Sequence, residues 1–533
     1  MITSVQTKFQ ISFCCKVIGL FFLLSYKTIL LQAQSDKFLD PREAKEHYSH
    51  KNYIAALRVY KELLKKDAQN VDYRYKIALC YLNTNINKSL AIPYLEFITK
   101  KSDAENEAWF DLGRAYHYAG RFDDAIKAYT KYKQSAGSKD QEKAERRIEM
   151  CYNGKELMKF PLDVKFENLG KEINSENPDY YPFITSNESF MVFTSRREEN
   201  IGGEKEIDGY YSSDIYISST KNGVWTKPRN VGEGISTRYD EQAVDLSSDG
   251  RYLMIYLDHI DSLGNIYLSE YRKTTFEEPE KLNHNVNQGF ESSGSIAKEG
   301  NLIFFASERS GGLGETDIYM AKKLPNGQWA VPQNLGPNIN TKYKEDFPHL
   351  SDDGKTLYFA SQGHSSMGDF DIFKAIWDEE TNTWSPPKNI GYPINTTGDD
   401  RNISFTADGR TAYLSSLREG GLGDLDIYKV TFNSSPDQQG QGYTIVSGHV
   451  LTGDTINKKI EATITAMNIT TNEEFTYIPT VSSGKYVMAL SPGKYTISIE
   501  STGYKFLVDN IVILDKGSFQ PEISKDFLLV KSK

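Results

Sequence analysis

One composite motif recurs five times between residues 160 and 434, and it constrains the fold of this chain more than any other feature. Each copy has a turn followed by an apolar run, and then a second run that begins with Asp-Ile-Tyr or a close variant. The turn segments begin at Ser186, Ser248, Lys298, Asp352 and Ala407. The second runs begin at Asp214, Asn265, Asp317, Asp371 and Asp426. Short apolar runs bounded by turn residues predict antiparallel strands.

A third element sets the period of these copies. It is marked by Asn168, Asn230, Leu282, Asn334 and Asn389, which lie 62, 52, 52 and 55 residues apart. This spacing is near that of a four-stranded propeller blade. The last copy lacks its third strand, whereas residues 160–170 supply one at the front. We therefore predict a five-bladed β-propeller over residues 160–433, closed by pairing these two ends so that no sheet edge stays open.

The copies resemble the WD-like repeats of TolB-type propellers, including Ser195-Arg196 and the loop at residues 307–312. The resemblance covers all five copies, and that family uses its propellers mostly to bind partners. Fold alone does not decide function, so the residues need their own interpretation.

The repeated carboxylates Asp214, Asp317, Asp371 and Asp426 raise the question of a catalytic or metal-binding ring. Asn265 replaces one of them, and an amide accepts the same hydrogen bond but cannot act as an acid. We interpret the set as a structural hydrogen bond to a neighbouring turn, repeated in each copy. The Asp-Gly pairs are interpreted as ordinary hairpin turns.

Signatures of catalysis are missing from the sequence. It contains no Gly-x-Ser-x-Gly nucleophile elbow, no Walker loop, no His-Glu-x-x-His and no dinucleotide fingerprint. The Gly-rich loops at 311–314 and 420–423 do not open a helix, as phosphate binding would require. The sequence therefore predicts a protein that is not an enzyme and that has no cofactor and no metal site.

Residues 37–157 carry apolar residues at helical spacing with a period near 34 residues. The clearest unit contains Trp109, Leu112, Gly113, Tyr116, Ala125 and Tyr129, which matches the tetratricopeptide signature position by position. Gly113 and Ala125 fall where the two helices of a repeat approach too closely for larger side chains. We predict three repeats, with an insertion of about one residue near residues 85–88, and a final capping helix over 139–157.

Stacked helix pairs form a groove that is lined by the first helix of each pair. The residues predicted to face it are Tyr48, Tyr75, Leu79, Phe110, Arg114 and His117. Two interpretations remain open, because these side chains either bind a partner segment or complete the packing against the next domain.

The first 33 residues read as a secretory signal peptide, because basic residues precede an apolar run and a cleavage-like Leu-Gln-Ala-Gln follows. Lys27 interrupts the run and leaves it short for a membrane span. Cleavage after Ala33 changes the net charge from −10 to −13, which disfavours a nucleic-acid partner. Cys80 and Cys151 remain after cleavage, and both are expected to be buried in helices without a disulfide.

A Ser/Pro/Gln/Gly-rich linker at 434–442 precedes alternating strands over 443–533, which predict a small β-sandwich. The segments Ser483-Gly484-Lys485-Tyr486 and Pro492-Gly493-Lys494-Tyr495 resemble the carboxypeptidase-regulatory-like, transthyretin-type sandwich. The predicted fold class is therefore multidomain: an all-α tetratricopeptide solenoid, then a five-bladed propeller, then a sandwich.

This order of modules resembles the envelope proteins of the OmpA family that accompany type IX secretion and gliding machineries. In that family a peptidoglycan-binding OmpA-like domain usually follows, and here the chain ends at Lys533 where it would begin. The resemblance implies a periplasmic, outer-membrane-associated or surface location and other envelope proteins as partners, whereas direct peptidoglycan binding is not expected.

Two functional hypotheses follow. The first is an exported envelope scaffold that binds proteins through its helical groove and propeller face. The alternative is a periplasmic or surface propeller that binds or processes glycans.

Overall fold

The computed structural model describes residues 40–259, 262–433, 443–453, 460–514 and 522–532. The predicted signal peptide at 1–33 and the linker at 434–442 lie outside the described residues. The helices are α2 Pro41–Ser49, α3 Tyr53–Lys66, α4 Val71–Leu82, η1 Lys88–Ala91, α5 Ile92–Thr99, α6 Asn106–Tyr118, α7 Phe122–Lys133 and α8 Ser138–Leu157. Within these ranges no helix is both long and apolar enough to cross a membrane.

The helices pack as successive pairs, and glycines set the closest approaches between them. A Cβ atom on Gly113 would lie 2.5 Å from the ring of Tyr129, so α6 and α7 meet at a distance that only glycine allows. A Cβ atom on Gly154 would likewise lie 2.6 Å from the ring of Phe122, so α8 packs against α7 at a distance that only glycine allows. The insertion expected near residues 85–88 is accommodated by the 3₁₀ turn η1 before α5.

The strands after α8 form one antiparallel sheet for each copy of the repeated motif. The first sheet comprises β2 Asp179–Ile184, β3 Phe190–Ser195, β4 Asp214–Lys221, β5 Val224–Trp225 and β6 Arg229–Asn230. The second comprises β7 Asp240–Leu246, β8 Tyr252–His259, β9 Ser262–Arg272, β10 Thr275–Phe276 and β11 Glu280–Lys281. The third comprises β12 Glu291–Ile296, β13 Leu302–Ser307, β14 Asp317–Lys322 and β15 Gln333–Asn334. The fourth comprises β16 Glu345–Leu350, β17 Thr356–Ser361, β18 Asp371–Asp378, β19 Thr383–Trp384 and β20 Lys388–Asn389. The last comprises β21 Ser404–Phe405, β22 Thr411–Ser416, β23 Asp426–Phe432 and β1 Val164–Asn168.

The sheets are arranged in a ring. Each neighbouring pair shares its own hydrophobic cluster, and one cluster joins the last sheet back to the first through residues such as Tyr413 and Phe193. The predicted pairing of the chain ends of this region is confirmed, because β1 pairs with β23 and Val164 lies opposite Phe432. This arrangement is consistent with a β-propeller, and residues 164–432 are called the propeller region below.

The repeated aspartates make the structural hydrogen bonds that the sequence indicates. Asp371 accepts from the backbone N–H groups of Met367 (3.0 Å) and Gly368 (2.8 Å) and from the Asn389 amide (2.7 Å). Asp214, Asp317 and Asp426 bond in the same way to a loop N–H and to Asn230, Asn334 and Asn168, respectively. No group of three metal-ligating side chains occurs among the described residues. Each carboxylate therefore ties a loop to the outermost strand of its own sheet.

A second set of buried acids stands where the innermost strands begin. Glu345 accepts hydrogen bonds from the backbone and hydroxyl of Thr341 and from the hydroxyl of Ser361, at 2.6–2.8 Å. Burial raises the pKa of Glu345 to about 7, although these donors favour the charged form. Burial likewise raises the pKa values of Glu241 and Asp400 to about 7.

We expect stability to fall as pH rises from about 4.5 to about 7, because the folded protein holds a proton on Glu345 that the unfolded chain releases near pH 4.5. A Glu345→Gln variant has no group that titrates here, so it should lose this pH dependence, which amounts to up to about 3 kcal/mol in the free energy of unfolding. The glutamine amide still fits the site, because it can donate to the hydroxyls of Thr341 and Ser361, which rotate to accept. Urea unfolding followed by tryptophan fluorescence at pH 5 and pH 8 measures the effect. Glu299→Gln, at an exposed turn position, is the control. An unchanged pH dependence in Glu345→Gln contradicts this assignment.

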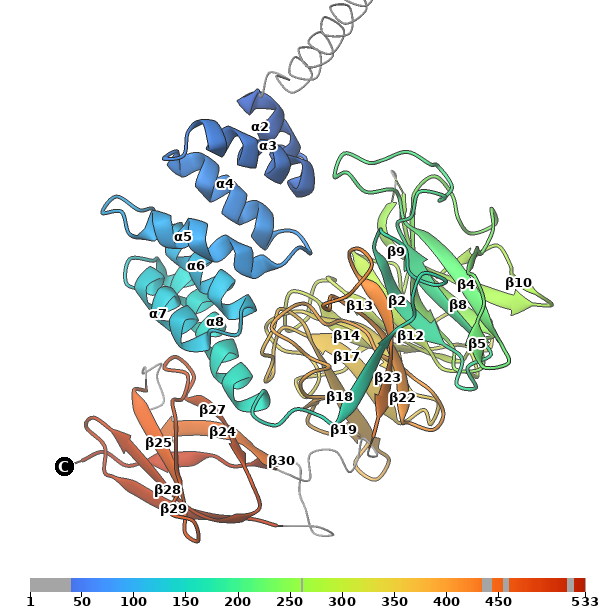
Figure 1. Ribbon diagram of the computed structural model, residues 1–533. Helices are drawn as coiled ribbons and strands as arrows, with labels where there is room; N and C mark the ends of the chain where they lie inside the picture. Colours follow the sequence, from blue (N-terminus) through green and yellow to red (C-terminus); the bar gives the residue numbers. More distant parts are fainter. Residues whose placement is uncertain (1–39, 260–261, 434–442, 454–459, 515–521, 533) are drawn as a thin grey trace, which may run out of the picture.

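The last strands form two sheets that share one hydrophobic core. They are β24 Thr444–Thr452, β25 Ala462–Asn468, β26 Glu474–Tyr477, β27 Lys485–Leu490, β28 Gly493–Ser501, β29 Leu507–Ile513, β30 Glu522–Ser524 and β31 Phe527–Leu529. We call these residues the carboxyl-terminal module. The helical stack runs along one side of the propeller region, and the carboxyl-terminal module lies beside α8 at the lower end of the stack (Figure 1).

Candidate functional site

The helical groove and the propeller region meet at the loop between β17 and β18, residues 362–369, which we call the docking loop. Its backbone carbonyls are held by side chains of α6 and α8. Asn153 donates to the carbonyl of Ser366 at 2.9 Å, and His117 Nε2 contacts the carbonyl of Met367 at 2.8 Å. Since a carbonyl only accepts, His117 carries its proton on Nε2. Burial lowers the pKa of His117 to about 4, so the ring is neutral at pH 7.

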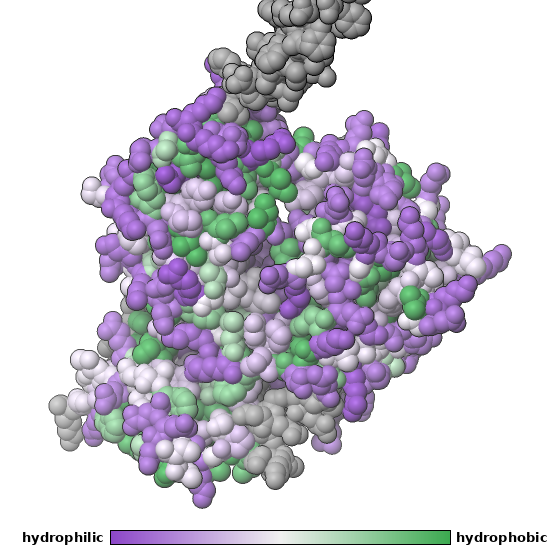
Figure 2. All heavy atoms as spheres, in the orientation of Figure 1, coloured by the Kyte–Doolittle hydropathy of each residue, from purple (hydrophilic) through white to green (hydrophobic). Residues whose placement is uncertain are grey.

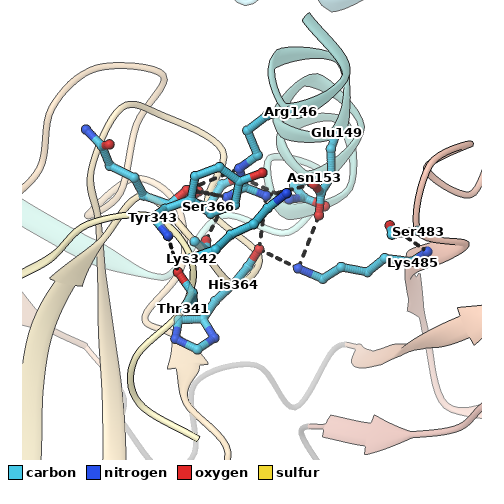
Figure 3. Close-up of polar contacts among 12 residues, drawn as sticks. Arg146, Glu149, Asn153, Thr341, Lys342, Tyr343, His364, Ser366, Ser483 and Lys485 are labelled. Atoms are coloured by element: carbon cyan, nitrogen blue, oxygen red, sulfur yellow. Dashed lines mark hydrogen bonds and ion pairs between the residues drawn. The ribbon is translucent and has the colours of Figure 1, made fainter. Parts of the chain in front are cut away.

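Arg146 on α8 makes the densest contacts with the docking loop (Figure 3). Its guanidinium donates to the carbonyls of Gln362 (2.5 Å) and Gly363 (2.7 Å) and to the hydroxyl of Ser366 (2.6 Å). The side chain is almost completely buried, and it also pairs with Glu149 at 2.8 Å. One arginine therefore replaces the hydrogen bonds that the loop backbone would otherwise make with water.

Asp369 ends the docking loop in a charged cluster. It accepts from Arg147 at 2.6 Å and from the Tyr118 hydroxyl at 2.5 Å. Burial acts to raise the pKa of Asp369, but the Arg147 charge and these hydrogen bonds outweigh it and hold the pKa at about 2. Asp369 is therefore ionised and paired under all ordinary conditions.

The carboxyl-terminal module joins the same junction through Lys485 (Figure 3). Its ammonium donates to the carbonyl of His364 at 2.7 Å and pairs with Glu149 at 3.1 Å. Burial acts to raise the pKa of Glu149, but the charges of Arg146 and Lys485 outweigh it and hold the pKa at about 2. Glu149 thus connects all three parts of the chain at one point.

A cavity of about 360 Å³ lies beside this junction, between the helices and the propeller region. We call it the interdomain cavity. Its walls include Lys88, Arg114 and Tyr118 from the helices and Tyr181, Asp399 and Arg401 from the propeller region. Figure 2 shows a hollow between the upper helices and the propeller region, with hydrophobic side chains along its helical border. The wall of the cavity is therefore rich in charged and aromatic groups.

The residues predicted to face the groove fall into four places. His117 is buried against the docking loop, and Arg114 lines the interdomain cavity. Tyr48, Tyr75 and Leu79 are half-buried farther along the stack. Phe110 does not face the groove, because its ring packs inside the repeat, 5.3 Å from that of Tyr129 and 5.0 Å from that of Tyr132.

Hydrogen bonds connect the groove floor to the cavity. The Tyr75 hydroxyl donates to Asp111 at 2.8 Å, and Arg114 pairs with the same carboxylate at 3.1 Å. Lys76 lies 4.3 Å from the centre of the Tyr48 ring. Of the two interpretations left open by the sequence, packing against the next domain holds for His117, while a partner-binding role of Tyr48, Tyr75 and Leu79 stays a prediction.

Sequence reasoning missed the interface on α8, namely Arg146, Arg147, Glu149 and Asn153. A capping helix was expected there, with a polar outer face. The available signal was the adjacent pair Arg146-Arg147 on a helix whose apolar face is otherwise committed to α7. That signal is weak, since two exposed arginines give the same pattern.

Comparison with known proteins supports the prediction of tetratricopeptide repeats. A tetratricopeptide repeat family model matches residues 87–140. Among solved structures, the chain is similar to TolB from Acinetobacter baumannii, with 16% identity over 55% of this chain and 70% of that one and a TM-score of 0.32. No curated protein sequence matches the chain.

The prediction, drawn from missing catalytic motifs, that the chain is not an enzyme is contradicted, because solved structures similar to this chain include enzymes. An α-L-arabinofuranosidase from Lactobacillus brevis has 13% identity over 52% of this chain and 93% of that one, with a TM-score of 0.33. A prolyl endopeptidase (10% identity, TM-score 0.26) covers 80% of this chain and 58% of its own. The match to a puromycin hydrolase (9% identity, TM-score 0.25) covers 64% of this chain and 52% of the hydrolase. These likenesses concern the fold alone and assign no activity here.

Proposed function

We propose that this protein is an exported scaffold of a cell envelope that binds a segment of a partner protein in its helical groove. The observation that carries the proposal is the docking loop itself. Side chains of α6 and α8 hold its irregular backbone by direct hydrogen bonds to the carbonyls of Gln362, Gly363, Ser366 and Met367. These contacts show the chemistry by which the helices can hold a peptide backbone, and the proposal places a partner segment along Tyr48, Tyr75 and Leu79, which are half-buried on α2 and α4.

The finer features of the proposal come from the sequence. They are secretion by a signal peptide, a five-bladed propeller, a carboxypeptidase-regulatory-like sandwich and kinship with OmpA-family proteins of secretion or gliding machineries. The five sheets of the propeller region and the shared core of the carboxyl-terminal module support the two fold assignments. Partners would then be other envelope proteins.

Capture experiments test the scaffold. The mature chain is immobilised, and proteins retained from envelope extracts are identified with and without chemical crosslinking. We expect a reproducible partner that also retains this protein in the reciprocal experiment. A Leu79→Glu variant places a charge in the free part of the groove and should abolish retention, whereas Ile54→Glu changes a residue that is already 47% exposed on α3 and should not.

Retention that is equal for both variants, or no reciprocal partner at all, overturns the proposal. A panel of glycans tested for binding and hydrolysis by the same protein addresses the alternative function. Specific binding or turnover there would favour the glycan hypothesis.

A further inference from the structure

Lys88 is a cation in the wall of the interdomain cavity whose partners are all neutral. Its ammonium donates to the carbonyls of Leu82 at 3.0 Å and Thr84 at 2.8 Å, where α4 ends. It also lies 5.1 Å from the centre of the Tyr118 ring. Within the described ranges no carboxylate pairs directly with Lys88. Burial lowers the pKa of Lys88 and outweighs the charges of Asp369, Asp399 and Asp424, which favour its charged form.

The other charges around the cavity are matched within the protein. Asp369 pairs with Arg147 at 2.6 Å, and Asp399 pairs with Arg401 at 3.0 Å. Arg114 shares Asp111 with the Tyr75 hydroxyl. Asp400 is buried and accepts from the backbone and hydroxyl of Thr396. Lys88 is therefore the positive charge of this wall that lacks a direct counter-charge.

Lys88 is partly buried, and a cation in such a place without a direct counter-charge gains an interaction from a ligand that supplies one. The space next to Lys88 is about 360 Å³, which accommodates one chain end or one acidic side chain with its neighbours but not a folded domain. Arg114 lines the same space and is held by Asp111, which also accepts from the Tyr75 hydroxyl of α4. A peptide end or side chain that enters this space would lie next to both Lys88 and Arg114.

We infer that the interdomain cavity binds a carboxylate of the partner peptide, with Lys88 as its counter-charge and Arg114 as a second donor. This inference rests on the proposed scaffold function. The carboxylate comes either from a chain end or from an aspartate or glutamate side chain, because both present the same two oxygens. The ring faces of Tyr118 and Tyr181 line the same cavity and suit an aromatic or aliphatic neighbour of that carboxylate.

Four short peptides test the inference against the full mature chain by calorimetric titration. They are acetyl-Ala-Tyr-Ala-Ala with a free carboxyl end, the same peptide as an amide, acetyl-Ala-Tyr-Asp-Ala amide and acetyl-Ala-Tyr-Asn-Ala amide. We expect at least one acidic peptide to bind about tenfold more tightly than its neutral match, with affinity that falls as salt rises. The acidic peptide that binds identifies the source of the carboxylate.

Two variants, one that removes a positive charge and one that removes a negative charge, distinguish recognition of the carboxylate from a structural role of Lys88. Lys88→Met keeps the apolar stem and should weaken the acidic peptide about tenfold. Asp399→Asn removes a negative charge from the same wall and the partner of Arg401, and it should strengthen binding of the acidic peptide. A purely structural contribution would weaken binding in both, and circular dichroism verifies that both variants are folded.

Several results would overturn the inference. They are equal binding of acidic and neutral peptides, changes of the same sign in the two variants, and no saturable binding of any acidic peptide. Failure of the scaffold proposal is distinguished from failure of this inference by the capture experiment. If the partner captured by the wild-type protein is retained equally by Lys88→Met, the scaffold stands and the carboxylate site does not.

Discussion

Replacing Arg146 with methionine is expected to uncouple the helical stack from the propeller region. Methionine fills much of the same space, but the carbonyls of Gln362 and Gly363 lose their buried donor and Glu149 loses one of its two cations. Breaking such a buried charged contact costs about 3–5 kcal/mol. In urea, helical circular dichroism should therefore report a transition at lower denaturant than tryptophan fluorescence, which comes mostly from the propeller region.

Lys342→Met is the matched control for Arg146→Met. Lys342 also connects the propeller region to α8, through Glu142, but both side chains are 59% exposed. An exposed pair of this kind contributes about 0–1 kcal/mol, so the two transitions should stay together. If Arg146→Met behaves like Lys342→Met, the docking loop does not hold the helices in place. Limited proteolysis at the loop gives an independent measurement.

Gly113→Ala is expected to destabilise the helical stack by about 2 kcal/mol or more. The added Cβ would lie 2.5 Å from the ring of Tyr129, which is fully buried and has no space into which to move. Alanine favours helix by about 1 kcal/mol over glycine, so the packing clash acts against a local gain. Thermal unfolding followed by helical circular dichroism measures the net effect.

The control for this substitution is Gly137→Ala, since no atom outside its immediate chain neighbours lies within 4 Å of a Cβ at Gly137 and its φ is −68°. The loss there should be smaller, below about 1 kcal/mol, because alanine is only a somewhat poorer N-cap than glycine. A stabilising Gly113→Ala would show that helix propensity outweighs packing and that α6 and α7 can separate. The tetratricopeptide interpretation of Gly113 would then be wrong.

The repeated elements were predictable because each has the same local geometry. Asp214, Asp317, Asp371 and Asp426 begin equivalent strands, and all of them bond to a loop N–H and to an asparagine of the outermost strand. The sequence predicted the bond to the neighbouring turn, but not the asparagine partner. The pairing of β1 with β23 followed from a missing strand at one end and a spare strand at the other.

The groove was predicted less well, because helical periodicity does not distinguish the side chains that face the groove from those inside a repeat. Phe110 occupies a signature position beside Trp109, and its ring turns toward Tyr129 and Tyr132 instead of the groove. His117 was expected to face the groove, and the structure places it against the docking loop. Lys88 had no signal in the sequence, since the far wall of its cavity comes from residues such as Tyr181, Asp399 and Arg401, more than 90 residues away.

The sequence by itself determined the helical pairs, the repeated strands and the hydrogen bonds within each sheet, because these depend on residues that recur at a short and constant spacing. Only the tertiary structure decided that residues 362–369 occupy one end of the helical groove, that Arg146 and Lys485 meet at Glu149, and that Lys88 faces a cavity. Each of these contacts joins surfaces that occur once in the chain and lie far apart along it. Their formation depends on how whole modules pack, for which no periodic pattern exists.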